Sequence, residues 1–161
     1  MIKKIEIERF SVISAKPFDD VIAVISAAVG HPDMAEFWKS TKQARFLSEL
    51  EEIINKITGS SGLMQFEELN HGAIIQADTG LKTRMLRLLI GNPLIMKEMA
   101  KRVPDAGSYA PVTVLVDERP DGVHLSYDRM ASFLAPYGNP DALAVARNLD
   151  EKVEGLLVKA A

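Results

Sequence analysis

His71, Tyr127 and Asp128 are the residues of this sequence whose types best suit proton transfer. An imidazole titrates near neutral pH, so it can give or take a proton there. His71 follows an apolar stretch that ends at Asn70, and segments that follow strands often carry functional groups. This pattern suits His71 as a general acid or base, assisted by Tyr127 or Asp128. The commoner role of a histidine in an Asn70-His71-Gly72 turn is to bond a backbone carbonyl.

The tripeptide Gly91-Asn92-Pro93 suits an anion site, because a glycine lets a ligand approach the free N–H groups at the start of a helix. The same tripeptide is also an ordinary helix start, with Asn as the cap and Pro in the first turn. Gly138-Asn139-Pro140 repeats it at a second predicted helix start. This repetition favours the structural interpretation of Asn92.

Strand alternation predicts that Tyr127 points into the core with its hydroxyl at a polar edge. His124, Ser126 and Asp128 then share the opposite face, which either lines a cleft or, more commonly, faces solvent. The sequence has three histidines, with no pair at ligand spacing, so we predict no metal site.

Familiar cofactor and catalytic motifs are absent from the sequence. It has no cysteine, which removes thiolate nucleophiles and iron–sulfur ligation. It also has no phosphate-binding glycine loop, dinucleotide fingerprint or serine elbow, so we predict no cofactor. Trp38, Met96 and Met99 occur at helical spacing and are expected in the core or an interface rather than against a cofactor.

Composition narrows the class of protein. The 161 residues suit one domain, and 47% apolar with 25% charged residues is the balance of a globular protein. The net charge is −3 with scattered Lys and Arg, so we expect no nucleic-acid partner. The longest apolar run, Val21 to Val29, is too short for a membrane helix, and residues 1–6 contain no apolar signal core. We therefore predict a cytoplasmic protein that does not bind membranes.

The spacing of apolar residues predicts an alternation of strands and helices. Residues 71–79 suit either an irregular or a helical connection, and we favour these over a strand. The other predicted elements are strands at 5–12, 63–69, 85–90, 112–116 and 123–128 and helices at 17–30, 31–42, 46–58, 92–103 and 139–157. Their order predicts an α+β fold in which helices pack on an antiparallel sheet. The strand Val112–Val116 is apolar on nearly both faces, so helices or a second copy of the chain should cover both.

The order of several short motifs resembles the domain-of-unknown-function 302 family. These motifs are Asn70-His71, Leu88–Pro93, Ala110-Pro111 before the apolar strand, and Tyr127-Asp128. The matching stretch runs from Leu63 to about Tyr137, and the first strand and helix also fit. The chain departs from the family at Asn70 and Ile90, where an acidic and an aromatic residue are common. Residues 31–42 look like an addition to the shorter members.

The resemblance implies a two-layer, TATA-binding-protein-like α+β fold with a long C-terminal helix, and a homodimer. It implies no established activity. We expect residues 1–161 to form a single domain with an added helical segment near residues 31–58.

Three functions remain open. The first is a homodimeric module that binds or senses a small molecule, in a cleft between the sheet and the helix that begins at Asn139. Its candidate ligand-binding residues are His71, Gly91, Asn92, Tyr127 and Asp128. The second is an enzyme that uses His71 as acid or base. The third is an interaction domain without a ligand.

Overall fold

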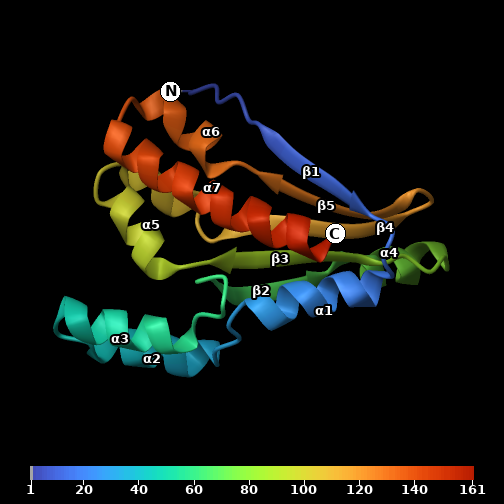
Figure 1. Cartoon of the computed structure of the whole chain (residues 1–161), viewed down its shortest axis with the longest axis horizontal. Coiled ribbons are helices and arrows are strands. Elements are labelled where there is room, and N and C mark those ends of the chain that lie inside the picture. The colour runs from blue at the N-terminus through green and yellow to red at the C-terminus, as the bar shows by residue number, and fades with distance from the viewer. Residues whose placement is uncertain (1) are drawn as a thin grey trace.

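A computed structural model describes residues 2–161 (Figure 1). The strands are β1 (Arg9–Ser14), β2 (Met64–Asn70), β3 (Met85–Gly91), β4 (Val112–Arg119) and β5 (Gly122–Asp128). The α-helices are α1 (Phe18–Ala28), α2 (Met34–Gln43), α3 (Leu47–Ile57), α4 (His71–Thr79), α5 (Pro93–Ala100), α6 (Met130–Leu134) and α7 (Pro140–Ala160). Two short 3-10 helices are η1 (Pro104–Ser108) and η2 (Ala135–Tyr137).

The five strands form one antiparallel sheet in the order β1-β5-β4-β3-β2. The predicted apolar strand β4 is therefore central. Val114 pairs with Tyr127 on one side and with Leu88 on the other, so these three side chains share one face. All three are buried.

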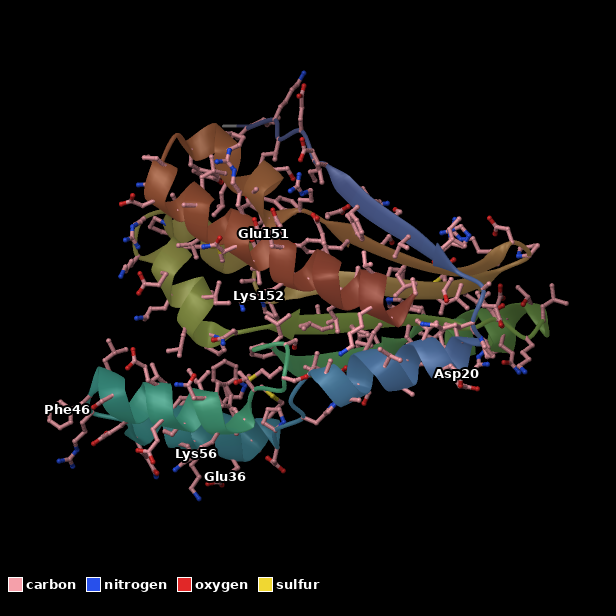
Figure 2. All side chains as sticks on the ribbon, in the orientation of Figure 1. Asp20, Glu36, Phe46, Lys56, Glu151 and Lys152 are labelled. Atoms are coloured by element: carbon pink, nitrogen blue, oxygen red, sulfur yellow. The ribbon has the colours of Figure 1, made fainter. Side chains whose placement is uncertain are left out.

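Helices α1 and α7 cover one face of the sheet (Figure 1). Phe18, Val21 and Ile25 from α1 and Leu149 and Val153 from α7 pack onto the strands in one apolar core. Glu151 and Lys152 lie on the outer side of α7, as its amphipathic sequence requires (Figure 2). The two-layer α+β prediction is confirmed. None of the described helices is long and apolar enough to span a membrane.

Among residues 2–161, no helix layer covers the opposite face of the sheet, and we call this face the open face (Figure 1). Strand alternation places Arg9, Ile13, Arg87, Leu115 and Asp128 on it. Arg87 is exposed and Leu115 is half-buried, although Leu115 lies near the centre of the sheet. The central strand is thus covered by helices on one side only.

Helices α2 and α3 pack at one end of the sheet, beside β2 (Figure 1). Their small apolar cluster contains the buried Phe37, Ile54 and Met64, with Phe66 partly buried against it. The Asp33 side chain accepts a hydrogen bond from the Glu36 N–H at 2.9 Å and so caps α2.

Several predicted boundaries differ from the structure by three residues or more. The strand predicted at 112–116 extends to Arg119, the helix predicted from residue 31 begins at Met34, and the helix predicted at 139–157 extends to Ala160. The first strand begins at Arg9 rather than Ile5, because its partner β5 ends at Asp128, which pairs with Arg9. Residues before Arg9 therefore have no strand to pair with. Helix α5 ends at Ala100 rather than Val103, and the 3-10 helix that begins at Pro104 follows it. Residues 71–79 are helical, as favoured.

A fully buried carboxylate, Asp150, joins α7 to β5 and α6. It accepts hydrogen bonds from the Tyr127 hydroxyl at 2.6 Å and from the Met130 and Ala131 N–H groups at 2.7 and 3.1 Å. Burial raises the pKa of the Asp150 carboxyl. Because three donors converge on it, Asp150 supports the chain turn from β5 into α6. No sequence pattern predicted this role.

Candidate binding pocket

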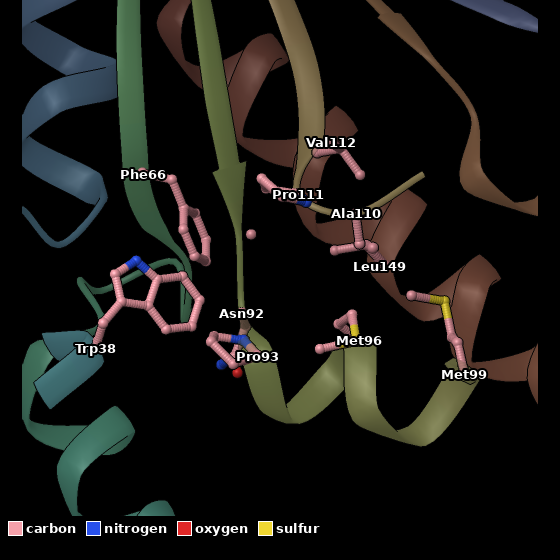
Figure 3. Close-up of a pocket in the computed structure, with 11 residues that line it drawn as sticks. Trp38, Phe66, Asn92, Pro93, Met96, Met99, Ala110, Pro111, Val112 and Leu149 are labelled. Atoms are coloured by element: carbon pink, nitrogen blue, oxygen red, sulfur yellow. The ribbon is translucent and has the colours of Figure 1, made fainter. Parts of the chain in front are cut away.

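An apolar pocket lies at the end of the sheet where β3 ends and β4 begins (Figure 3). Its volume is about 150 Å³. The pocket is lined by Trp38, Phe66, Gly91, Asn92, Pro93, Met96, Met99, Ala110, Pro111, Val112 and Leu149. None of these residues carries a charged side chain. The pocket therefore suits an apolar group rather than an ion.

Several parts of the fold supply the walls. Trp38 from α2 and Phe66 from β2 lie on one side of the pocket (Figure 3). Met96 from α5 and Pro111, which precedes β4, lie across from them (Figure 3). The Trp38 residue is 50% exposed to solvent, which is high for the largest apolar side chain in the sequence.

Gly91 forms part of the wall between Phe66 and Pro111. A Cβ atom at this position would lie 3.4 Å from the Pro111 Cβ and 3.6 Å from the Phe66 Cε2. These are ordinary van der Waals distances, so a Cβ would fit between the two neighbours, and a larger side chain would narrow the pocket that Gly91 lines. The absence of a side chain at Gly91 therefore contributes directly to the pocket.

Asn92 fixes the chain where it leaves β3. Its side-chain oxygen accepts a hydrogen bond from the Leu94 N–H at 2.8 Å and caps α5. Its side-chain nitrogen donates to the Gly62 carbonyl at 2.9 Å. Asn139 caps α7 in the same way, accepting from the Ala142 N–H at 2.9 Å. Asn92 is thus a cap in the structure, and both of its polar atoms are engaged.

His71 and Asp128 line a different hollow, of about 310 Å³, on the open face. Arg87 and Thr113 also line it, and Arg87 donates to the Thr113 hydroxyl at 3.2 Å. Both Asp128 oxygens accept hydrogen bonds from the Arg9 guanidinium, at 2.6 and 2.9 Å. Asp128 is therefore held by Arg9, and no hydrogen bond joins it to His71 among the described residues.

Tyr127 points to the other side of the sheet, as alternation predicted. Its hydroxyl is bonded to Asp150, and burial raises the pKa of this phenol. The predicted cleft beside Asn139, with His71, Asn92 and Tyr127 around it, is not what the structure contains. Tyr127 also borders the open-face hollow with His71 and Asp128. Successive residues of β5 face opposite sides, so the Tyr127 hydroxyl points away from that hollow and reaches Asp150. The candidate residues are divided between the apolar pocket, the core and the open face.

The aromatic and thioether residues of the pocket were expected in the core or an interface. The helical spacing of Met96 and Met99 could not distinguish a filled core from a cavity, because both need apolar side chains. Phe66 and Pro111 attracted no functional interpretation. The most useful sequence signal was Gly91, since a glycine between a strand and a helix start marks missing side-chain volume. Among residues 2–161, no three His, Asp or Glu side chains gather as a metal site would require.

Comparison with known families shows which family the chain belongs to. The family described as "Domain of unknown function DUF302" matches residues 40–160. The chain belongs to the DUF302 family. A crystal structure of an uncharacterised conserved DUF302 protein from Bacillus stearothermophilus is similar to it, with a TM-score of 0.67 and 12% sequence identity. The similarity covers 95% of this chain and 98% of that chain, and it shows a shared fold. The curated proteins include no match to this sequence.

The DUF302 match begins inside α2, two residues after Trp38. Phe66, Gly91, Met96 and Pro111 all lie within the matched residues. The pocket thus combines a wall from the DUF302 region with one aromatic side chain from the segment before it.

The two Gly-Asn-Pro tripeptides offer a matched test of the role of Asn92. Asn139→Ala removes one cap hydrogen bond and is expected to lower the free energy of unfolding by about 1 kcal/mol. Asn92→Ala also removes the bond to Gly62 and should cost roughly 1 kcal/mol more. Urea unfolding of both variants measures this difference. Equal losses would mean that the bond between Asn92 and Gly62 contributes nothing.

Proposed function

We propose that this protein is a homodimeric binding module for a small, uncharged apolar molecule. The single observation that carries the proposal is the pocket beside Gly91, which has a volume of about 150 Å³ and no charged lining residue. An apolar cavity of about this size can remain dry and bind a molecule such as benzene. The ligand would gain the contacts that the pocket walls lack when it is empty.

The pocket opens partly to solvent beside Trp38, which is 50% exposed, so a ligand can reach it from the surface. Filling Gly91 with a larger residue would remove part of the void. The backbone at Gly91 is not in the left-handed region, so other residues fit its conformation. The cavity is therefore not forced on the chain by backbone geometry, which supports a role in binding.

Toluene is a suitable probe, since it is small, neutral and apolar. Its binding should raise the melting temperature in proportion to the logarithm of its concentration, by roughly 3–6 °C at ten times the dissociation constant. Gly91→Val, which extends a side chain toward Phe66 and Pro111, should abolish this rise. Differential scanning calorimetry of the sealed sample measures both.

Gly107→Ala is the matched control. A Cβ atom at Gly107 meets nothing within 4 Å, and the residue is not part of the pocket. This variant should show the same rise with toluene as the natural sequence. A natural protein whose melting temperature does not respond to toluene, or a Gly91→Val variant that responds fully, would contradict the proposed site.

The open face supports the homodimer. It carries the apolar side chains of Ile13, Met85, Leu89 and Leu115, and Ile13 is 51% exposed. Apolar side chains gathered on one face of a sheet commonly mark a surface that a partner covers. Five strands about 4.8 Å apart and roughly 20 Å long give a face of about 500 Å² in projection. Because side chains project from the sheet, the accessible area of this face is larger than its projection and closer to the roughly 800 Å² that each partner buries in a standard interface.

The charges on the open face favour a second copy of this chain as the partner. Arg9 and Asp128 pair with each other, as do Arg119 and Asp117. Arg87 forms no ion pair with any described residue, and neither does Glu67 on the adjacent strand β2. Since a two-fold axis brings each surface against itself, Arg87 of one copy can meet Glu67 of the other.

Charge exchange tests this interface. Arg87→Glu places a second acidic residue beside Glu67 and should shift the protein from dimer to monomer in sedimentation equilibrium. Adding Glu67→Arg restores opposite charges and should recover the dimer. Leu115→Glu, in the middle of the face, should also give a monomer.

Val158→Glu is the control for added charge, because Val158 is 59% exposed on α7, away from the open face. It should leave the dimer intact. Circular dichroism establishes that each variant is folded. A natural protein that sediments as a monomer would contradict the dimer while leaving the apolar pocket in place.

The enzymatic alternative for His71 has less support. The two residues proposed to assist it form hydrogen bonds elsewhere. Asp128 accepts from Arg9, and Tyr127 donates to Asp150 on the other side of the sheet. A dimer formed through the open face would cover the hollow that His71 lines. His71 would then lie at the interface.

A further inference from the structure

Two aromatic rings define one side of the apolar pocket. The ring centroids of Trp38 and Phe66 are 6.4 Å apart, and the ring planes meet at 40°. The buried Phe37 contacts both, at 4.8 Å from Trp38 and in an edge-on contact at 6.4 Å from Phe66. Figure 3 shows Trp38 and Phe66 together at one wall. A third ring therefore supports the two that face the cavity, which fixes the direction of their π faces and edges.

The remaining wall suits the edge of an aromatic ligand. Met96 and Met99 line the pocket from α5 (Figure 3). A thioether sulfur is polarisable and makes favourable contacts with ring edges. Pro111 adds an apolar saturated ring across from Phe66. A planar ring in the cavity would meet aromatic surface on one side and sulfur on the other.

The pocket has no charged lining residue, and this distinguishes it from aromatic sites that bind cations. Sites for quaternary ammonium groups also use aromatic rings. A cation enclosed in an apolar site needs a counter-charge, and no lining residue is acidic. The Asn92 side chain is the only amide in the lining, and both of its polar atoms are already bonded to the backbone.

We infer that the pocket selects a planar, uncharged aromatic ring over a saturated ring of the same size, and that Trp38 is the specificity-determining residue. This inference rests on the proposed binding function and names the ligand class of the same site. Trp38 lies before residue 40, where the DUF302 match begins. The aromatic wall therefore combines Trp38, which precedes the matched residues, with Phe66, which lies within them.

Anisole and cyclohexyl methyl ether provide a matched pair of probes, since both are neutral, lack a hydrogen-bond donor and have the same heavy-atom skeleton. The natural protein should bind anisole about three- to tenfold more tightly, the range expected for one favourable aromatic contact. Trp38→Leu keeps an apolar side chain but removes the ring, so both probes should bind with similar affinity. Trp38→Phe should retain a preference for anisole.

Trp38 is the sole tryptophan of the chain, so its fluorescence reports binding directly in the natural protein. Chemical-shift changes of the Met96 and Met99 methyl groups report binding in all variants. Equal affinity for both probes in the natural protein would overturn the aromatic preference while leaving the apolar binding site standing. A preference that persists in Trp38→Leu would overturn the role of Trp38. Tighter binding of tetramethylammonium than of anisole would overturn the neutral ligand class, and binding of neither ring would overturn this inference together with the proposed function.

Discussion

The Asn92 side chain determines where β3 stops and α5 starts. Its oxygen holds the first turn of α5 and its nitrogen holds the Gly62 carbonyl, just before β2. The chain therefore leaves the sheet at a fixed place, with Gly91 between Phe66 and Pro111. Gly91 lines the apolar pocket there without adding a side chain between those two neighbours. The apolar pocket follows from this local constraint more than from any feature of the sheet as a whole.

Strand alternation separates the polar candidates from the pocket. On β5, Tyr127 faces the helices and reaches the buried Asp150, while Asp128 faces the open side and pairs with Arg9. His71 begins α4 and lines the open-face hollow with Asp128. The ionisable groups thus either support the fold or belong to the open face. What remains at the end of β3 is an apolar site suited to packing against a ligand rather than to proton transfer.

Most of the fold could be predicted from the sequence, because the positions of its strands and helices depend on local patterns. The apolar run Val112–Val116, which predicted a central strand, and the caps at Asn92 and Asn139 are visible in short stretches of sequence, and the structure has them. The pocket was harder to predict, because long-range packing is needed to bring its lining residues together. These include Trp38, Phe66, Met96 and Pro111. An apolar residue gives the same pattern whether its neighbour is a side chain or a void. Asp150 was missed since a single Asp within the apolar stripe of a helix does not reveal which buried donors face it.

The pocket links the fold to the proposed function, because ligand binding there requires that the pocket is empty and apolar. The direct measurement is a crystal structure of the protein under xenon pressure, because xenon enters small apolar cavities. We expect a xenon atom beside Gly91, between Phe66, Met96 and Pro111. Ordered water molecules in that space, or side chains collapsed into it, would contradict an empty apolar pocket.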